Sequence, residues 1–324
     1  MKQIIKLLII LLSVIFTLAC SNDTIQIKGG IDQVSVQSTY NFSYNGQEIE
    51  IIYFFEEMLN YTKLKSENPT LDNEDTFTKA VLMPFQDKSS IDYYNLEDFL
   101  KPTNKLNQLE ENTNELLENA KKISRWIEEA IVESIEILPG GDTTFYVFPI
   151  IPDDWFAIMN MKGVSGASFF GNKVILMLDP SFEEEMLKYA VAHEYNHTVH
   201  MSHNGTQGIS TILDRIITEG KADNFAKTLY PAMTVPWTVQ LSENEETAIL
   251  EKLNKIHDST NYEDYDDFLY DNSTIAIPMW ADYKIGYKIT ESFINKNPNT
   301  PIPEWTKMDA KELVKKSDYS NLLE

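Results

Sequence analysis

The sequence predicts an α+β fold in which a small, mostly antiparallel sheet is combined with a bundle of helices. Two short runs rich in β-branched and aromatic residues, 143–151 and 173–178, predict buried strands. Apolar residues recur at helical spacing before these runs, over residues 104–138, and again after them, over residues 210–230. Because no repeat and no convincing linker follows residue 50, we expect a single domain at residues 48–324.

The composition is that of a globular protein with a strong negative charge. There are 27 Lys+Arg against 50 Asp+Glu, a formal charge of -23, and 43% of the residues are hydrophobic. This hydrophobic content permits a large buried core and argues against disorder. The acid excess argues against a nucleic-acid partner, because sequence-independent binding needs cationic side chains that displace phosphate counterions.

The amino terminus predicts export and lipid attachment. Lys2 and Lys6 form a short positive region before a mostly apolar run, Leu7–Ala19. This run is too short for the ~20 residues of a membrane-spanning helix but fits a secretory signal. The only cysteine, Cys20, follows directly, as in the lipobox of bacterial lipoproteins. Thr17 stands where that motif usually has an aliphatic residue, so an uncleaved signal anchor with an incidental cysteine is the alternative.

We therefore expect residues 1–19 to be a lipoprotein signal peptide and residues 20–47 to be a polar tether. Lipid on Cys20 would anchor the protein to the extracytoplasmic face of a bacterial cell membrane. Removal of the signal leaves no other cysteine, which excludes disulfides, thiolate metal sites and a cysteine nucleophile.

Residues 48–140 predict a mainly helical portion, and residues 141–324 predict the core that carries the chemistry. Helical spacing favours a helix over Ile51–Tyr61. Residues 104–138 predict one long amphipathic helix or two in tandem, which Pro139-Gly140-Gly141 ends.

A metal-binding motif lies on the helix that follows the strands. Ser181 and Glu184 have capping-box spacing, which predicts where this helix begins. The helix then carries His193-Glu194-Tyr195-Asn196-His197, an HExxH motif. Four residues advance a helix by about 400°, so both imidazoles lie on one face and can bind one Zn²⁺ ion. Glu194 can then reach a water molecule on the ion.

Catalytic zinc needs a third protein ligand and an open fourth position. His203 lies ten residues after His193, the spacing of the metzincin pattern, but no helix breaker precedes Asn204-Gly205. On an unbroken helix His203 would point roughly 100° away from the metal. Glu219, inside the second helical pattern, is the better candidate because a returning helix brings it to the metal.

Two neighbours of Glu219 support this assignment. Asp223 lies four residues further on the same face, where a carboxylate can accept the outer N–H of a ligating histidine. Gly220 inside a helix costs about 1 kcal/mol relative to alanine, which suggests that another helix approaches closely there. A solvated acidic face is the alternative interpretation of both acids.

The motif residues resemble a known family. YAVAHEYNH at residues 189–197 and ITEGKA at residues 217–222 resemble the predicted zinc-dependent protease family DUF2268, whose core reads approximately HEYxH and then EGxA. The resemblance extends from FYVFP at residues 145–149 to YKIGY at residues 283–287, and does not include the first 130 residues. It implies a zincin-like fold of the gluzincin type, with His193, His197 and Glu219 on zinc, Glu194 as catalytic base, and a peptide or protein substrate.

We expect a lipid-anchored peptidase in which Glu194 takes a proton from the attacking water. Tyr283, Tyr287 and His257 are candidates for stabilising the oxyanion, and Tyr287, behind Gly286, is favoured. The small-residue segment Gly163–Phe170 is either an edge strand that pairs with substrate or an ordinary turn. The alternatives are a binding lipoprotein that keeps the fold without catalysis, and a metzincin-like protease that uses His203.

Overall fold

The computed structural model describes residues 38–92, 96, 99–205, 210–270 and 276–324. The predicted signal peptide, Cys20 and most of the predicted tether lie outside these residues, so export and lipid attachment stay predictions. Within the described part of the chain, no helix is long and apolar enough to cross a membrane.

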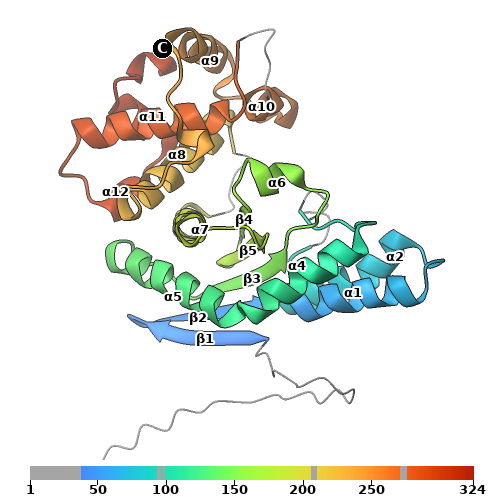
Figure 1. Ribbon diagram of the computed structural model, residues 1–324. Helices are drawn as coiled ribbons and strands as arrows, with labels where there is room; N and C mark the ends of the chain where they lie inside the picture. Colours follow the sequence, from blue (N-terminus) through green and yellow to red (C-terminus); the bar gives the residue numbers. More distant parts are fainter. Residues whose placement is uncertain (1–37, 93–95, 97–98, 206–209, 271–275) are drawn as a thin grey trace, which may run out of the picture. The chain divides into compact units, whose positions relative to one another are not determined.

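The core of the fold is a five-stranded mixed sheet with the strand order β1-β2-β3-β5-β4 (Figure 1). The strands are β1 (Thr39–Tyr44), β2 (Gln47–Tyr53), β3 (Thr143–Pro149), β4 (Val164–Phe169) and β5 (Lys173–Leu178). The two outer pairs, β1–β2 and β4–β5, are antiparallel, and the two inner pairs are parallel. The α+β class is confirmed, and β4 is left as an edge strand with one main-chain side unpaired by the sheet.

The strands β3 and β5 are the two predicted buried runs, and their apolar side chains are almost completely buried. The sheet begins at Thr39, inside the predicted tether. The predicted helix over Ile51–Tyr61 is wrong at its first residues, because β2 continues to Tyr53 and the helix begins at Phe55. The last three residues of β2, Ile51, Ile52 and Tyr53, are all buried, and so short an apolar run has no periodicity that separates strand from helix.

Helices cover the sheet and extend beyond it. The N-terminal portion contains α1 (Phe55–Glu67), α2 (Asn73–Phe77), a π-helical turn (Thr78–Leu82), α3 (Met83–Ser89), α4 (Leu106–Glu118) and α5 (Ala120–Ile137). The periodic stretch at residues 104–138 is therefore two helices in tandem, which meet at Asn119. Aromatic rings of β3 and α1–α3 form one core together with Phe54, which directly precedes α1. The Phe54 and Phe148 rings stack there with centroids 4.7 Å apart.

The remaining helices build the metal-binding half of the domain. They are α6 (Trp155–Met159), α7 (Glu184–Asn204), α8 (Ile212–Leu229), α9 (Glu243–Ile256), α10 (Tyr262–Leu269), α11 (Ala281–Lys296), α12 (Ile302–Lys307) and α13 (Ala310–Lys315). Helix α7 packs against α5, β4 and β5 on one side and against α8 and α12 on the other (Figure 1). It therefore lies between the sheet and the C-terminal helices.

Helix α7 carries the HExxH motif without interruption. The predicted capping box is wrong: the helix begins at Glu184, and the Ser181 hydroxyl donates to Asp179 instead. Acidic residues in its first turn are favourable there because the helix dipole is positive at that end. The helix continues to Asn204 and ends at Gly205, whose φ of 69° suits glycine. No break occurs where a metzincin helix would end.

Helices α8 and α11 touch backbone to backbone. A Cβ placed on Gly220 would lie 2.1 Å from the carbonyl carbon and oxygen of Gly286, and one on Gly286 would lie 2.0 Å from the Ile216 carbonyl oxygen. The close approach predicted from Gly220 is confirmed. Because Gly220 follows Glu219 directly, this contact fixes α11 against the helix that supplies the third candidate ligand.

Candidate metal centre

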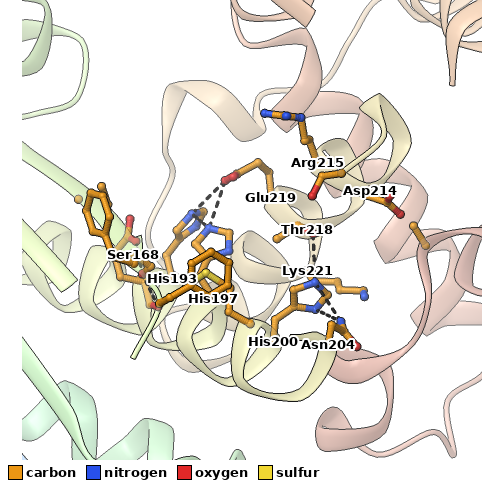
Figure 2. A pocket seen from close by; sticks show the side chains of 18 of the residues that line it. Ser168, His193, His197, His200, Asn204, Asp214, Arg215, Thr218, Glu219 and Lys221 are labelled. Atoms are coloured by element: carbon orange, nitrogen blue, oxygen red, sulfur yellow. Dashed lines mark hydrogen bonds and ion pairs between the residues drawn. The ribbon is translucent and has the colours of Figure 1, made fainter. Parts of the chain in front are cut away.

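Three side chains from two helices converge on one point. Helix α7 supplies His193 and His197, whose Nε2 atoms are 3.0 Å apart. Helix α8 supplies Glu219, whose Oε2 lies 3.3 Å from Nε2 of His193 and 3.4 Å from Nε2 of His197. Figure 2 shows both imidazoles and the carboxylate directed toward each other. The structure thus brings together the three residues predicted as ligands, and as a group they could hold a metal ion.

The geometry fits a tetrahedral zinc site. Zinc bonds of 2.0–2.2 Å at tetrahedral angles place neighbouring ligand atoms about 3.3 Å apart, close to the three separations found here. Oε2 of Glu219 is a buried oxygen without a hydrogen-bond partner, as a metal ligand would be before the cation binds. Burial raises the pKa of the Glu219 carboxyl, but His197 and His193 lower it by more, so the carboxyl group stays ionised.

Two other histidines of α7 take no part in the cluster. His203, the alternative ligand, is exposed in the last turn of the helix. His200 is directed toward α12, with its Nδ1 atom 2.8 Å from the main-chain oxygen of Thr306. The metzincin alternative therefore has no geometric support.

Asp223 orients one of the imidazoles. Its Oδ1 atom lies 3.1 Å from Nδ1 of His193 and also accepts hydrogen bonds from the Tyr189 hydroxyl, at 2.9 Å, and from Nε1 of Trp237, at 3.1 Å. A carboxylate on Nδ1 selects the tautomer whose Nε2 lone pair faces the metal. Asp223 was predicted from the sequence, whereas its donors Tyr189 and Trp237 were not.

The carboxylate of Glu194 is held by β4. The Ser168 hydroxyl lies 2.7 Å from Oε2 of Glu194 and 2.9 Å from its main-chain oxygen. A Cβ on Gly166 would come within 2.6 Å of Oε1, so this position must be glycine if the carboxylate is to stay where it is. The small-residue segment thus forms the edge strand β4 and is not a turn, and it holds the Glu194 carboxylate beside the metal cluster.

Tyr283 lies beside the candidate metal cluster. Its ring lies 6.4 Å from the ring of His193, nearly parallel to it, and no described residue makes a hydrogen bond with its hydroxyl. The hydroxyl of Tyr287 instead lies 3.3 Å from Oε1 of Glu291, one turn further along α11. His257 is paired with Asp258 at the end of α9. Of the three oxyanion candidates, only Tyr283 is brought to the metal cluster.

A cavity of about 950 Å³ gives access to the cluster. Its walls come from β4, α7, α8, α10 and the segment that joins α12 to α13. Glu194, the three candidate ligands and Tyr283 all border it, whereas Tyr287 does not. The volume lies within the range of small-molecule and cofactor sites, roughly 300–1,000 Å³.

Comparison with known proteins agrees with this geometry. The family model described as a predicted Zn-dependent protease, DUF2268, matches residues 123–315. No curated protein and no solved structure matches the chain. The matched region is more than half of the sequence, and it contains the candidate ligands, Glu194, Asp223 and Tyr283. The chain therefore belongs to the DUF2268 family of predicted Zn-dependent proteases.

Proposed function

We propose that this protein is a zinc metallopeptidase that hydrolyses peptide bonds outside a bacterial membrane, to which lipid on Cys20 anchors it. The observation that carries the proposal is the buried carboxylate of Glu194 beside the His193–His197–Glu219 cluster. A protein that only bound metal, or only bound peptide, would have no use for a fixed base at this place. The alternative of a non-catalytic binding lipoprotein is therefore less well supported.

Each residue of the site has a separate role in the proposed hydrolysis. When bound, zinc supplies a Lewis acid and lowers the pKa of a water molecule toward about 7. Glu194 accepts the proton of the attacking water and passes it to the leaving amine. Ser168 holds the Glu194 carboxylate during both transfers.

The edge strand β4 gives a place for the substrate. Residues 166–169 of this strand border the large cavity, and one main-chain side of β4 makes no hydrogen bonds within the sheet. An extended peptide can add to such an edge through its own main-chain groups. We propose that the substrate binds in this way, which places its backbone along the strand that holds Glu194.

We assign stabilisation of the oxyanion to Tyr283. Burial, together with the nearby carboxylates of Glu219 and Asp282, raises the pKa of Tyr283 well above its ordinary value, so the phenol stays a hydrogen-bond donor at neutral pH. Tyr283→Phe is expected to lower kcat by about 100-fold, because a donor to the developing oxyanion is typically worth that much or more. Steady-state kinetics beside the bound-zinc content measures this.

The matched control is Tyr287→Phe, the same substitution one turn later on α11. It should leave kcat within about twofold, because this hydroxyl interacts with Glu291 and Tyr287 does not border the large cavity. A larger loss from Tyr287→Phe than from Tyr283→Phe would return the role to Tyr287.

The metal and the anchor can be tested together in bacterial cells that produce the full chain. Cleavage of a broad mixture of unstructured peptides is expected to sediment with the membranes. A zinc chelator should abolish it, and added Zn²⁺ should restore it, because the ligands are already arranged by two packed helices. The measurements are the cleavage rate and the fraction in which it is found.

Cys20→Ser separates the two parts of this proposal. The variant should carry no lipid, measured from the mass of the N-terminal peptide, and should cleave peptides at an unchanged rate. Cleavage that resists the chelator would refute the metallopeptidase, whereas a wild-type protein without lipid on Cys20 would refute only the lipid anchor.

A further inference from the structure

A second, small cavity opens beside the metal centre between β4, α7 and the beginning of α11. Its volume is about 60 Å³. Gly166, His193, Glu194 and Tyr283 border both this cavity and the large one, so the proposed base lies between the two cavities. A reacting water must approach the scissile carbonyl to about 3–3.5 Å. In a peptide laid along β4, the group that reaches the small cavity is therefore a side chain next to the scissile bond.

The walls of this cavity are apolar. Beyond the four shared residues, it is lined mainly by methionine, aliphatic and tryptophan side chains: Met161, Val164, Met186, Ala190, Trp237 and Trp280. Tyr189 also lines it, but the polar hydrogens of Tyr189 and Trp237 are already donated to Asp223. Apart from His193 and Glu194, none of the described residues that line the cavity is charged. Apart from His193, Glu194 and Tyr283, which the proposed reaction uses, the cavity offers a polar side chain few partners to replace its lost water, whereas an apolar one gains by burial.

One wall is held rigidly. Trp280 has a φ of 58°, a left-handed conformation that is unfavourable for a residue with a side chain. Its main-chain N–H donates to the Leu269 oxygen at 3.1 Å, and its indole packs against Trp237 and Phe156, with ring centroids 5.8 and 5.5 Å away. Because Trp237 also donates to Asp223, this wall is connected to the metal centre itself. The cavity should therefore select by shape.

We propose that this cavity is a specificity pocket, and that the protein cleaves peptides next to an aliphatic residue whose side chain enters it. This inference rests on the proposed peptidase function and names its substrate class. The small volume favours aliphatic side chains over rings, because an apolar cavity that holds benzene measures about 150 Å³.

The test is a library of quenched fluorescent peptides that vary at the two positions flanking a single scissile bond, cleaved by the zinc-loaded protein. At one of these two positions, Leu or Val should give a kcat/KM about 100-fold above Asp or Lys and about 10-fold above Gly. This range is what apolar pockets achieve by contact alone, roughly 10–200-fold. Mass spectrometry of the products identifies the position.

Met161→Ala tests the pocket itself. Met161 is only partly buried, so its truncation enlarges the cavity with little loss of core packing, and the ratio of kcat/KM for Phe to that for Leu should rise about 10-fold. The matched control is Met159→Ala, the same substitution two residues earlier, at a methionine that is 72% exposed and does not line the cavity. It should leave the ratio within about twofold.

The outcomes separate the inference from the function on which it rests. Cleavage without an aliphatic preference at either position would overturn the specificity pocket and leave the peptidase in place. An aliphatic preference that Met161→Ala changes no more than Met159→Ala does would also overturn the pocket. A zinc-loaded protein that cleaves no peptide of the library would overturn the proposed function, and the inference with it.

Discussion

Glu194→Gln is expected to lower the rate of peptide hydrolysis by about 1,000-fold while the bound zinc stays at one ion per chain. Glutamine has the shape of glutamate and can keep a hydrogen bond to Ser168, but its amide cannot accept a proton from water. General-base assistance is typically worth about 10²–10⁴-fold, so most of the rate should be lost. The measurements are kcat on a cleaved peptide and the metal content of the same preparation.

This substitution also separates catalysis from binding. If the variant hydrolyses peptides as fast as the wild type, Glu194 is not the base and the mechanism is wrong. If neither protein hydrolyses any peptide, yet both bind peptides with the same affinity, the non-catalytic lipoprotein becomes the better explanation. Ser168→Ala is a useful companion, because it removes the side chain that holds the carboxylate and leaves the carboxylate itself.

The parts of the site that follow from local helix geometry could be predicted from the sequence. His193 and His197 share a helix face because they are four residues apart, and the same spacing relates Glu219 to Asp223. The choice of Glu219 over His203 needed only the absence of a helix breaker. Tyr189, four residues before His193, could have been found by the same reasoning.

The parts that depend on packing could not be predicted in this way. The favoured Tyr287 and the observed Tyr283 are one helical turn apart, and periodicity alone does not say which of them faces the metal. That choice is made where α11 crosses α8, at the contact between Gly220 and Gly286. Trp237 reaches Asp223 from a short 3₁₀ turn, Pro236–Thr238, whose position no sequence periodicity indicates.

Some predicted boundaries of helices and strands also differ from those in the structure. Glu and Ile alternate over residues 48–51 of β2, but Ile51, Ile52 and Tyr53, where the predicted helix began, are all buried and show no such alternation. The capping residues predicted for α7 had the right spacing, but Asp179 accepts the Ser181 hydrogen bond before the helix begins. The competing partner is itself local, two residues before Ser181, so spacing alone does not decide which hydrogen bond the serine makes.

Glu219→Ala is expected to weaken zinc binding by more than 100-fold. Side chains that only orient a ligand already change metal affinity by about 10–100-fold, and loss of a ligand should exceed that. The variant keeps only the two histidines as ligands. It also removes the carboxylate that lies within 3.4 Å of both of their Nε2 atoms. The measurements are equilibrium zinc titration and the melting temperature as a function of zinc concentration.

Measuring the melting temperature tests the assignment of Glu219 as a ligand without relying on enzymatic activity. A ligand that binds only the folded state stabilises it by about 2.7 kcal/mol at 100 times its Kd, so the wild type should melt at a higher temperature as zinc is added. Glu219→Ala should melt cooperatively, which shows that it is folded, but should not respond to the same zinc concentrations. The matched control is His203→Ala, which removes an exposed imidazole from the end of α7 and should behave as the wild type. If the two variants exchange these behaviours, His203 is the third ligand, and the helix must break before it when the metal binds.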